Sequence, residues 1–260
     1  MSSMNENIYL KKVKRRAGAQ WNTSEYPFCI PVIAGFTELE FTKSVTYIVG
    51  DNGSGKSTLL EAIAMLFGMN PEGGSKNFNF HTVETHSSLS DSLRAARASL
   101  NYNDTFFFRA ESFYNVNSEI ERLGRDSIAC YGGKSLHQLS HGEGFMALIK
   151  HRLSGRGIYI FDEPEAALSF QNQLAFLCWI KQTVAQGAQI IISTHSPVVL
   201  SYPDASIFEI EDGRLVAKQY QECNVYRNLM AFMTNREGCL NELGLLQDNE
   251  FMEKNRDKTL

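Results

Sequence analysis

The sequence lacks a long hydrophobic run. None of its apolar stretches approaches the roughly 18–20 residues that a membrane-spanning helix needs. The N-terminus carries early acidic and polar residues and no apolar core of signal-peptide length. We therefore expect a cytoplasmic protein without membrane insertion, which would work at a membrane only if another chain takes it there.

Cysteine pairs and an excess of positive charge are also missing. The five cysteines are scattered, odd in number and contain no CxxC pair, which indicates reduced thiols and argues against a disulfide framework or a zinc site. The net charge of −4 is not that of a polyanion-binding protein as a whole. Only residues 11–16 are densely basic; we interpret them as a solvated strand, and a local basic face stays compatible with this total.

Apolar strands alternate with helical segments over most of the 260 residues, of which 43% are hydrophobic. This alternation predicts an α/β domain with a mainly parallel sheet flanked by helices. We expect a single domain over 1–260, with a helical or loop sub-domain at about 70–150, an antiparallel β element and a helical tail at about 224–260. The expected strands are 45–50, 106–108, 157–161 and 189–193, with a hairpin at 206–218, and the expected helices are 56–67, 91–100, 119–123, 170–185 and one from 142.

The segment from Gly50 to Thr58 matches the pattern G-x-x-x-x-G-K-[ST] in full, between a predicted strand and a predicted helix. Its glycines let successive backbone N–H groups point at one anion, and the helix start adds its positive dipole end. The alternative is a glycine-rich turn before an ordinary helix. We predict that this loop binds the phosphates of ATP, with Ser57 also on Mg²⁺, through Asn52, Gly53, Ser54, Gly55, Lys56, Ser57 and Thr58.

Two adjacent acids, Asp162 and Glu163, end the apolar run 158–161, and Pro164 follows them. We predict that Asp162 faces the magnesium and that Glu163 orients, or accepts a proton from, the water attacking the γ-phosphorus. The alternative is a pair of exposed acids capping a strand. Together with the phosphate loop, the pair predicts an ATP hydrolase.

Two further segments indicate the branch of P-loop proteins. Leu139–Glu143 (LSHGE) resembles the LSGGQ signature of ABC-type ATPases, and Ile192–Pro197 (ISTHSP) resembles their switch-histidine segment. Glu165–Ser169 (EAALS) looks like their D-loop. The resemblance covers about residues 28 to 215, and all motifs occur in the family's order.

The resemblance implies a head-to-tail, ATP-dependent homodimer with two nucleotides between the subunits. Ser140 and Gly142 of one copy would contact the γ-phosphate held by the other, and His195 would hydrogen-bond that phosphate. The residues alone are compatible with this, since Ser140 stands at an N-cap position where a hydroxyl and free N–H groups converge. Ser140 could instead only cap its own helix, and His195 could be a satisfied structural residue.

The sequence departs from the transporter pattern at His141, Glu143 and Ser169. The continuation PEAALS resembles the SMC-like and RecF-like branch, and segments 26–31, 107–116 and 140–145 resemble a family of small bacterial stand-alone ATPases of the AAA/ABC type. No glutamine loop is identified; residues 81–86 or Gln138 are alternatives for its contact. Arg109 and Glu111 are candidates for contacts near the nucleotide, or for a buried ion pair.

Several functional classes follow from these motifs. The first is a conformational switch that hydrolyses ATP and acts on a protein partner. The others are a DNA-associated ATPase of SMC or repair type, for which nucleic acid would be the partner, the ATPase subunit of a membrane transporter, and a nucleotide-sensing module without turnover.

Overall fold

The computed structural model describes residues 8–75, 88–98, 101–122, 139–153 and 155–246. Contacts divide the chain into a large unit, Met1–Tyr220, and a small C-terminal unit, Gln221–Leu260. Each is considered by itself. All the motifs found in the sequence belong to the large unit.

A six-stranded sheet with the order β5-β6-β7-β3-β8-β9 forms the centre of the large unit. The strands from β5 to β8 are parallel, and β9 is antiparallel to β8. The central ones are apolar almost throughout because both faces are covered. This confirms the predicted fold class. The strands are β3 Val45–Val49, β5 Asp104–Arg109, β6 Gly157–Asp162, β7 Gln189–Ser193, β8 Ser206–Glu211 and β9 Arg214–Lys218.

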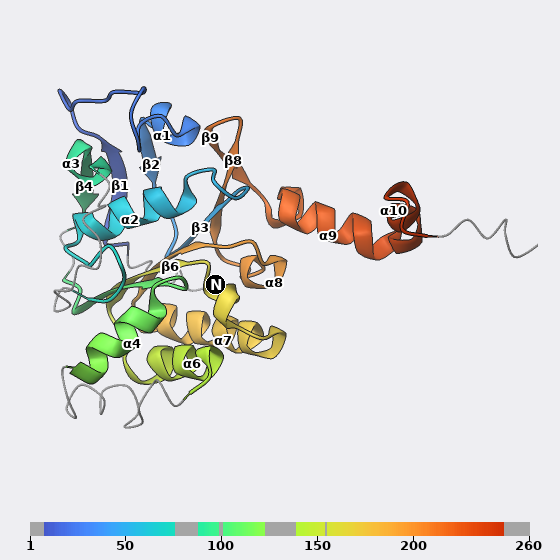
Figure 1. Cartoon of the computed structure of the whole chain (residues 1–260). Coiled ribbons are helices and arrows are strands. Elements are labelled where there is room, and N and C mark those ends of the chain that lie inside the picture. Colours follow the sequence, from blue (N-terminus) through green and yellow to red (C-terminus); the bar gives the residue numbers. More distant parts are fainter. Residues whose placement is uncertain (1–7, 76–87, 99–100, 123–138, 154, 247–260) are drawn as a thin grey trace, which may run out of the picture. The chain divides into compact units, whose positions relative to one another are not determined.

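Alternate residues of the central strands enter two different cores. Ile160 of β6 belongs to a cluster of aliphatic and aromatic residues that includes Leu59 of helix α2 (Lys56–Leu66). Its neighbour Phe161 points the other way, where its ring lies 5.1 Å from that of Phe176 in helix α7 (Phe170–Ala185). Helices α4 (Phe113–Arg122), α6 (His141–His151) and α7 cover this second face, opposite α2 (Figure 1). The sheet is thus fixed between two packed layers.

A second, antiparallel sheet of order β2-β1-β4 lies beyond α2 (Figure 1). Its strands are β1 Leu10–Arg15, β2 Glu38–Glu40 and β4 Leu93–Arg97. The helix predicted over 91–100 is wrong: a four-residue helix α3, Leu89–Ser92, leads directly into β4. Pairing with β1 overrides the helical propensity of this Ala- and Arg-rich segment, burying Leu93 and exposing Arg94 on alternate sides.

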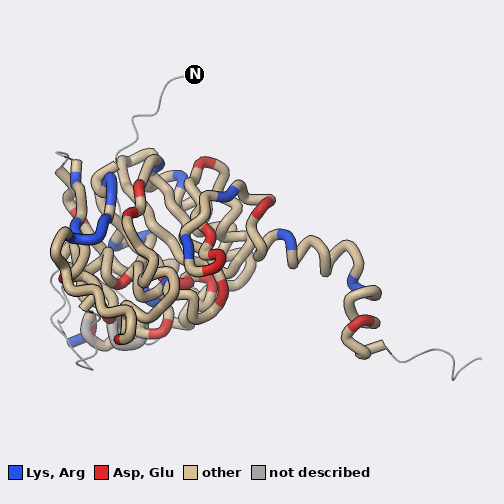
Figure 2. The backbone as a smooth tube through the Cα atoms, turned by 90° about the horizontal axis from the view of Figure 1, so that it is seen from above, with Lys and Arg blue, Asp and Glu red and all other residues tan. Residues whose placement is uncertain are grey.

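The basic residues of β1 lie among acidic ones. Lys12 Nζ lies 3.1 Å from Glu38 and 2.5 Å from Glu40 on the neighbouring strand. Acidic and basic residues are likewise interleaved along much of the large unit (Figure 2). Residues 11–15 of this basic segment therefore lie in a paired strand whose charge is partly neutralised, as the solvated-strand interpretation expects.

Short helices complete the description: α1 Pro31–Ala34, the 3₁₀ helices η2 Pro164–Ala167 and η3 Tyr220–Glu222, and α8 Pro197–Leu200. The small unit contains α9 Asn224–Thr234 and α10 Arg236–Glu242, with Asn235 capping α10 through Gly238 N–H. Among the described residues, no helix has both the length and the apolar character to cross a bilayer.

Candidate active site

The sequence motifs follow three strands that end at the same edge of the parallel sheet. β3 ends at the phosphate loop, β6 ends in the acid pair, and β7, between them, ends before His195. The carboxyl ends of parallel strands share an edge, which is where ligands bind in open α/β sheets. Residues that are far apart in the sequence therefore meet here.

The phosphate loop turns sharply into α2 at Gly55, which has a left-handed φ of 103°. A Cβ atom at this position would lie 2.8 Å from both Ile30 Cγ2 and Val32 Cγ1, so glycine is needed for packing as well as for conformation. Lys56 follows as the first helical residue. Its side chain is only 3% exposed, and its Nζ donates to the carbonyls of Gly50 and Asp51, each at 2.9 Å.

The loop carries polar groups suited to an anion. Ser54 Oγ is buried and has no hydrogen-bond partner among the described residues. Asn52 and Gly53 form an exposed turn before it, and Thr58 lies in the first turn of α2. A buried hydroxyl without a partner is costly unless a ligand supplies one. A phosphate in a cradle of backbone N–H groups would do so.

Asp162 is buried and lies between two hydroxyls. Its Oδ1 accepts from Ser193 Oγ at 2.5 Å and from Ser57 Oγ at 3.1 Å. Burial raises the pKa of this carboxyl, while the hydroxyl of Ser193 and the nearby Arg109 oppose the shift. Ser57 and Asp162 thus bring two hard oxygen ligands together, the donor type that Mg²⁺ prefers.

Glu163 is held at the centre of the site by backbone geometry. It has a left-handed φ of 50°, rare outside glycine, and its N–H is bonded to Ser193 O and Ser193 Oγ at 3.1 Å each. Its Oε1 lies 3.9 Å from Lys56 Nζ and 3.3 Å from His195 Nε2. Burial lowers the pKa of Lys56, and Glu163 is the strongest of the acids that oppose this shift.

Arg109 ends β5 opposite Asp162 and forms an ion pair, while its contact near the nucleotide stays a prediction. Its Nη1 lies 3.0 Å from Glu61 Oε2 on α2, forming the ion pair, while its Nε lies 3.6 Å from Asp162 Oδ2. Glu111 lines a cavity of about 220 Å³, which also borders Ser57, Ala110, His141, Asp162, Glu163, Ala166 and Ala167. The guanidinium therefore offsets part of the negative charge gathered at this edge.

Ser140 caps its own helix. Its Oγ accepts from Glu143 N–H at 3.3 Å and donates to Glu143 Oε2 at 2.8 Å, and its N–H donates to the same carboxylate at 2.9 Å. This is a capping box. Gly142 packs closely against η2, because a Cβ there would lie 3.0 Å from Ala167 O. The proposed phosphate contacts of Ser140 and Gly142 stay predictions.

Sequence reasoning missed two residues of this arrangement. Ser193 supports both Asp162 and Glu163, and its signal was a hydroxyl ending an otherwise apolar strand next to the strand of the acid pair. Glu165 was assigned only to the D-loop, yet its carboxylate bonds the backbone of His195. The alternatives for the glutamine loop, residues 81–86 and Gln138, lie outside the described residues.

Two family models match the chain. One, described as "AAA domain", covers residues 29–139, and the other, "AAA domain, putative AbiEii toxin, Type IV TA system", covers residues 136–201. The first spans the phosphate loop, and the second spans the signature-like segment, the acid pair and His195. The two matches together contain every residue of the predicted site.

Curated relatives include ATP-binding proteins of ABC transporters. The chain is 31% identical over 175 residues to the vitamin B12 import ATP-binding protein BtuD of Vibrio cholerae, a match covering 58% of this chain and 68% of that protein. It is 29% identical over 232 residues to the macrolide export ATP-binding/permease protein MacB 2 of Aeromonas hydrophila, covering 80% of this chain and 34% of that protein. The chain thus spans about a third of the length of MacB 2.

Solved structures show a more remote likeness. The SMC head domain from Thermotoga maritima aligns with a TM-score of 0.44 at 18% identity, covering 82% of this chain and 100% of that chain. The cbiO1 protein from Clostridium perfringens aligns with a TM-score of 0.48 at 18% identity, covering 92% and 100%. The motifs and the sequence relatives show that the chain belongs to the ABC-type P-loop ATPases, the family that its sequence resembles.

Proposed function

We propose that this chain binds ATP with Mg²⁺ and hydrolyses it to ADP and phosphate, at a site completed by a second copy. Membership of the ATPase family supports ATP as the ligand. The observation that carries the proposal is the convergence of Lys56, Glu163 and His195 at one sheet edge, with separations of 3.9 Å and 3.3 Å about Glu163. This is a cation, a carboxylate base and an imidazole where the phosphate loop ends.

The chain's own groups have separate roles in the proposed reaction. Lys56 exchanges its bonds to loop carbonyls for the β- and γ-phosphates, and N–H groups from Asn52 to Thr58 hold the remaining oxygens. Ser57 and Asp162 hold Mg²⁺, which when bound neutralises charge on the phosphate oxygens. Glu163 accepts the proton of the attacking water. His195 donates to the γ-phosphate and fixes that water.

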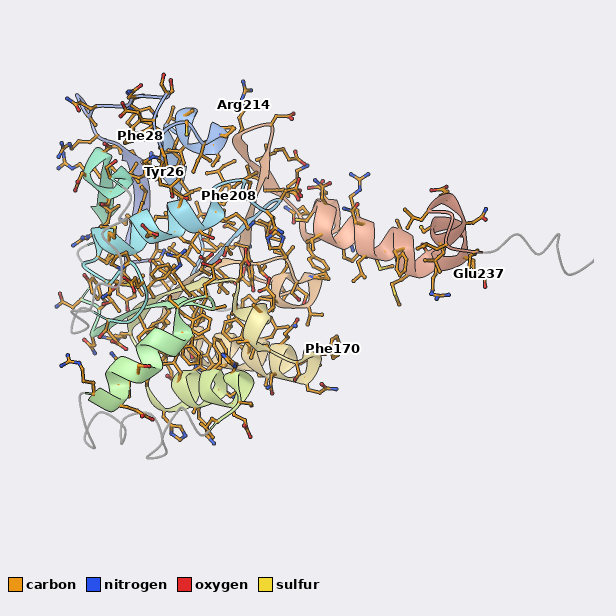
Figure 3. The ribbon with its side chains drawn as sticks, in the orientation of Figure 1. Tyr26, Phe28, Phe170, Phe208, Arg214 and Glu237 are labelled. Atoms are coloured by element: carbon orange, nitrogen blue, oxygen red, sulfur yellow. The ribbon has the colours of Figure 1, made fainter. Side chains whose placement is uncertain are left out.

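We further propose that two copies associate head to tail around two nucleotides. Ser140 and Gly142 of one copy then bind the γ-phosphate held by the other, so association depends on an intact γ-phosphate. An exposed apolar side chain shortly after the acid pair in the sequence supports a contact on this side: Phe170, at the start of α7, is 57% exposed and projects away from the unit (Figure 3). Ala166 and Ala167 precede it on the rim of the cavity.

The biological role proposed is a cytoplasmic switch, whose nucleotide-dependent association acts on a protein partner. In this proposal residues 1–260 form one ATPase domain, with a sub-domain at about 70–150 and a tail at about 224–260. The segment PEAALS after Glu163, with Ser169 rather than aspartate, supports the non-transporter branch. Glu165 and Ser169 both make structural contacts here, since Glu165 bonds His195 N–H and Ser169 caps α7.

The test is the variant Glu163→Gln, which keeps the shape of the side chain but cannot accept the proton. We expect ATP affinity to be retained, steady-state phosphate release to fall by on the order of 100-fold or more, and a dimer to accumulate in Mg-ATP. Light scattering after size exclusion gives the oligomer, and Glu25→Gln, at an exposed site, is the matched control. A monomeric Glu163→Gln protein in excess Mg-ATP would contradict the composite site.

A second candidate is the ATPase subunit of a membrane transporter. The observation that favours it is the function named for the curated relatives, import of vitamin B12 and export of macrolides. It predicts that an integral membrane protein co-purifies with the tagged chain from detergent-solubilised membranes. Recovery of the Glu163→Gln dimer with soluble partners alone would favour the switch.

A further inference from the structure

Two hydrogen bonds join the segment after Glu163 to the loop that carries His195. Glu165 Oε1 accepts from the backbone N–H of His195 at 2.5 Å. Gln173, in the first turn of α7, accepts from Ser196 Oγ at 2.6 Å and donates to Leu168 O at 3.3 Å. The loop of residues 194–196 is therefore attached to residues 165–173 at His195 itself and at the following Ser196.

A buried carboxylate is an unusual acceptor for a backbone N–H, yet Glu165 fills this role for His195. Its second oxygen, Oε2, is buried without a hydrogen-bond partner among the described residues, and no basic side chain is described as its ion-pair partner. The carboxylate also interacts with the hydroxyl of Thr194 and with its own backbone N–H, but all these donors are neutral, whereas burying a carboxylate has a desolvation cost. A charged acceptor makes a shorter and stronger bond than a neutral one. The desolvation cost at Glu165 is therefore consistent with a role of this bond in fixing the position of His195.

The geometry places His195 between two carboxylates of one short segment. Glu165 holds its backbone, while Glu163 Oε1 lies 3.3 Å from its Nε2, an atom that is buried without a hydrogen bond among the described residues. Ala166 and Ala167, which follow directly, line the cavity beside Asp162 and Glu163. A shift of η2 at the cavity rim would therefore move Glu165, and with it the backbone of His195.

We propose that Glu165 is a positioning residue, which holds His195 in register with Glu163 and transmits the position of η2 to the imidazole. This rests on the proposed roles of His195 and Glu163 in hydrolysis. Glu165 is not among the residues that line the cavity, so we expect it to act on the reaction through His195. Of the acids that raise the pKa of Lys56 it has the smallest effect, so we expect ATP affinity to depend mainly on the phosphate loop.

Three substitutions separate position, charge and shape. Glu165→Gln keeps an oxygen that can accept the N–H, so kcat is expected to stay within about threefold of the wild type. Glu165→Asp keeps the charge but shortens the arm by one methylene, and Glu165→Ala removes the acceptor. For both we expect kcat to fall by about 10- to 100-fold, with the KM for ATP changed by less than about twofold. Glu25→Ala, an exposed site, is the control.

A measurement on the nucleotide-free protein gives a readout other than activity. The imidazole resonance of His195, assigned by its loss in His195→Ala, should shift in Glu165→Asp and Glu165→Ala but not in Glu25→Ala. An unchanged resonance together with wild-type kcat in Glu165→Asp would overturn the inference. If Glu165→Ala does not fold, the comparison of Glu165→Gln with Glu165→Asp still tests the proposal, because it requires kcat to fall in Glu165→Asp and not in Glu165→Gln.

Failure of the inference differs from failure of the proposed function. Should His195→Ala hydrolyse ATP at the wild-type rate, the role of His195 in the proposed function is wrong. Should His195→Ala lose turnover while Glu165→Asp keeps both kcat and the resonance, only the positioning role is wrong.

Discussion

The phosphate loop and the start of α6 are both candidate phosphate-binding elements, and they differ in how far one chain completes them. Lys56 is almost fully buried, is hydrogen-bonded by the loop's own carbonyls and lies beside Asp162 and Glu163. Ser140 is exposed, and its hydroxyl and N–H are both bonded to Glu143. One half of the site is organised within the chain, whereas the other half is occupied by its own capping box. This asymmetry fits the proposed site shared between two copies.

The largest effect is expected from Lys56→Ala, which removes the cation of the phosphate loop and leaves Ser140 unchanged. Since Lys56 is the buried cation beside two carboxylates, its loss should weaken ATP binding by on the order of 100-fold or more. Calorimetry with ATP and Mg²⁺ measures this, and Lys14→Ala, on the exposed side of β1, is the control. Affinity within threefold of the wild type would mean that the loop is not the phosphate site.

A smaller effect is expected from Ser140→Ala, because the monomer's own ATP site is left intact. ATP affinity of the monomer should be unchanged, while nucleotide-dependent dimerisation in the Glu163→Gln background should weaken about 10-fold or more. Loss of the N-cap should also lower the free energy of unfolding by about 1 kcal/mol. Sedimentation velocity across a concentration series checks the dimer. If dimerisation is equally strong with and without the Ser140 hydroxyl, the only role of Ser140 is to cap its own helix.

The substitution Glu143→Gln tests the same half-site as Ser140→Ala. Its expected effect on dimerisation is smaller and opposite in sign. Its carboxylate lies 2.8 Å from Ser140 Oγ, where it would repel an approaching phosphate. Glu143→Gln keeps the pattern of the capping box and removes this charge. We expect the ATP-dependent dimer of Glu163→Gln to tighten by about two- to tenfold, most strongly at low ionic strength. A weaker dimer would show that the carboxylate contributes to the interface.

The features that could be predicted from the sequence are those encoded by residues close together in the chain. The phosphate loop, the acid pair and the hairpin around Asp212 are encoded by neighbouring residues, and the structure places all three as expected. The capping box was readable too, since Ser140 and Glu143 have the S-x-x-E spacing. The alternation of strands and helices was enough to give the fold class.

The misplaced or missed features depend on contacts between distant segments. Residues 93–97 have helical composition, and only pairing with β1, some 80 residues earlier, makes them a strand. Arg109 meets Asp162 because β5 is the neighbour of β6, an order that no local pattern encodes. The bond from His195 to Glu165 likewise joins residues 30 positions apart. Strand order therefore decides which polar groups reach the site.

The smallest effect concerns the pH dependence of stability at Glu165. Burial raises the pKa of its carboxyl above the ordinary value of 4.5, and the N–H of His195 only partly opposes this shift. Between the two values the folded chain binds more protons than the unfolded chain, so stability falls as pH rises through this window and is level above it. Glu165→Gln removes that dependence. The melting temperature of the variant minus that of the wild type should therefore increase with pH from about 4.5 upward and then level off. A difference that is flat, or that falls with pH, would mean that Glu165 is not a carboxyl penalised by burial.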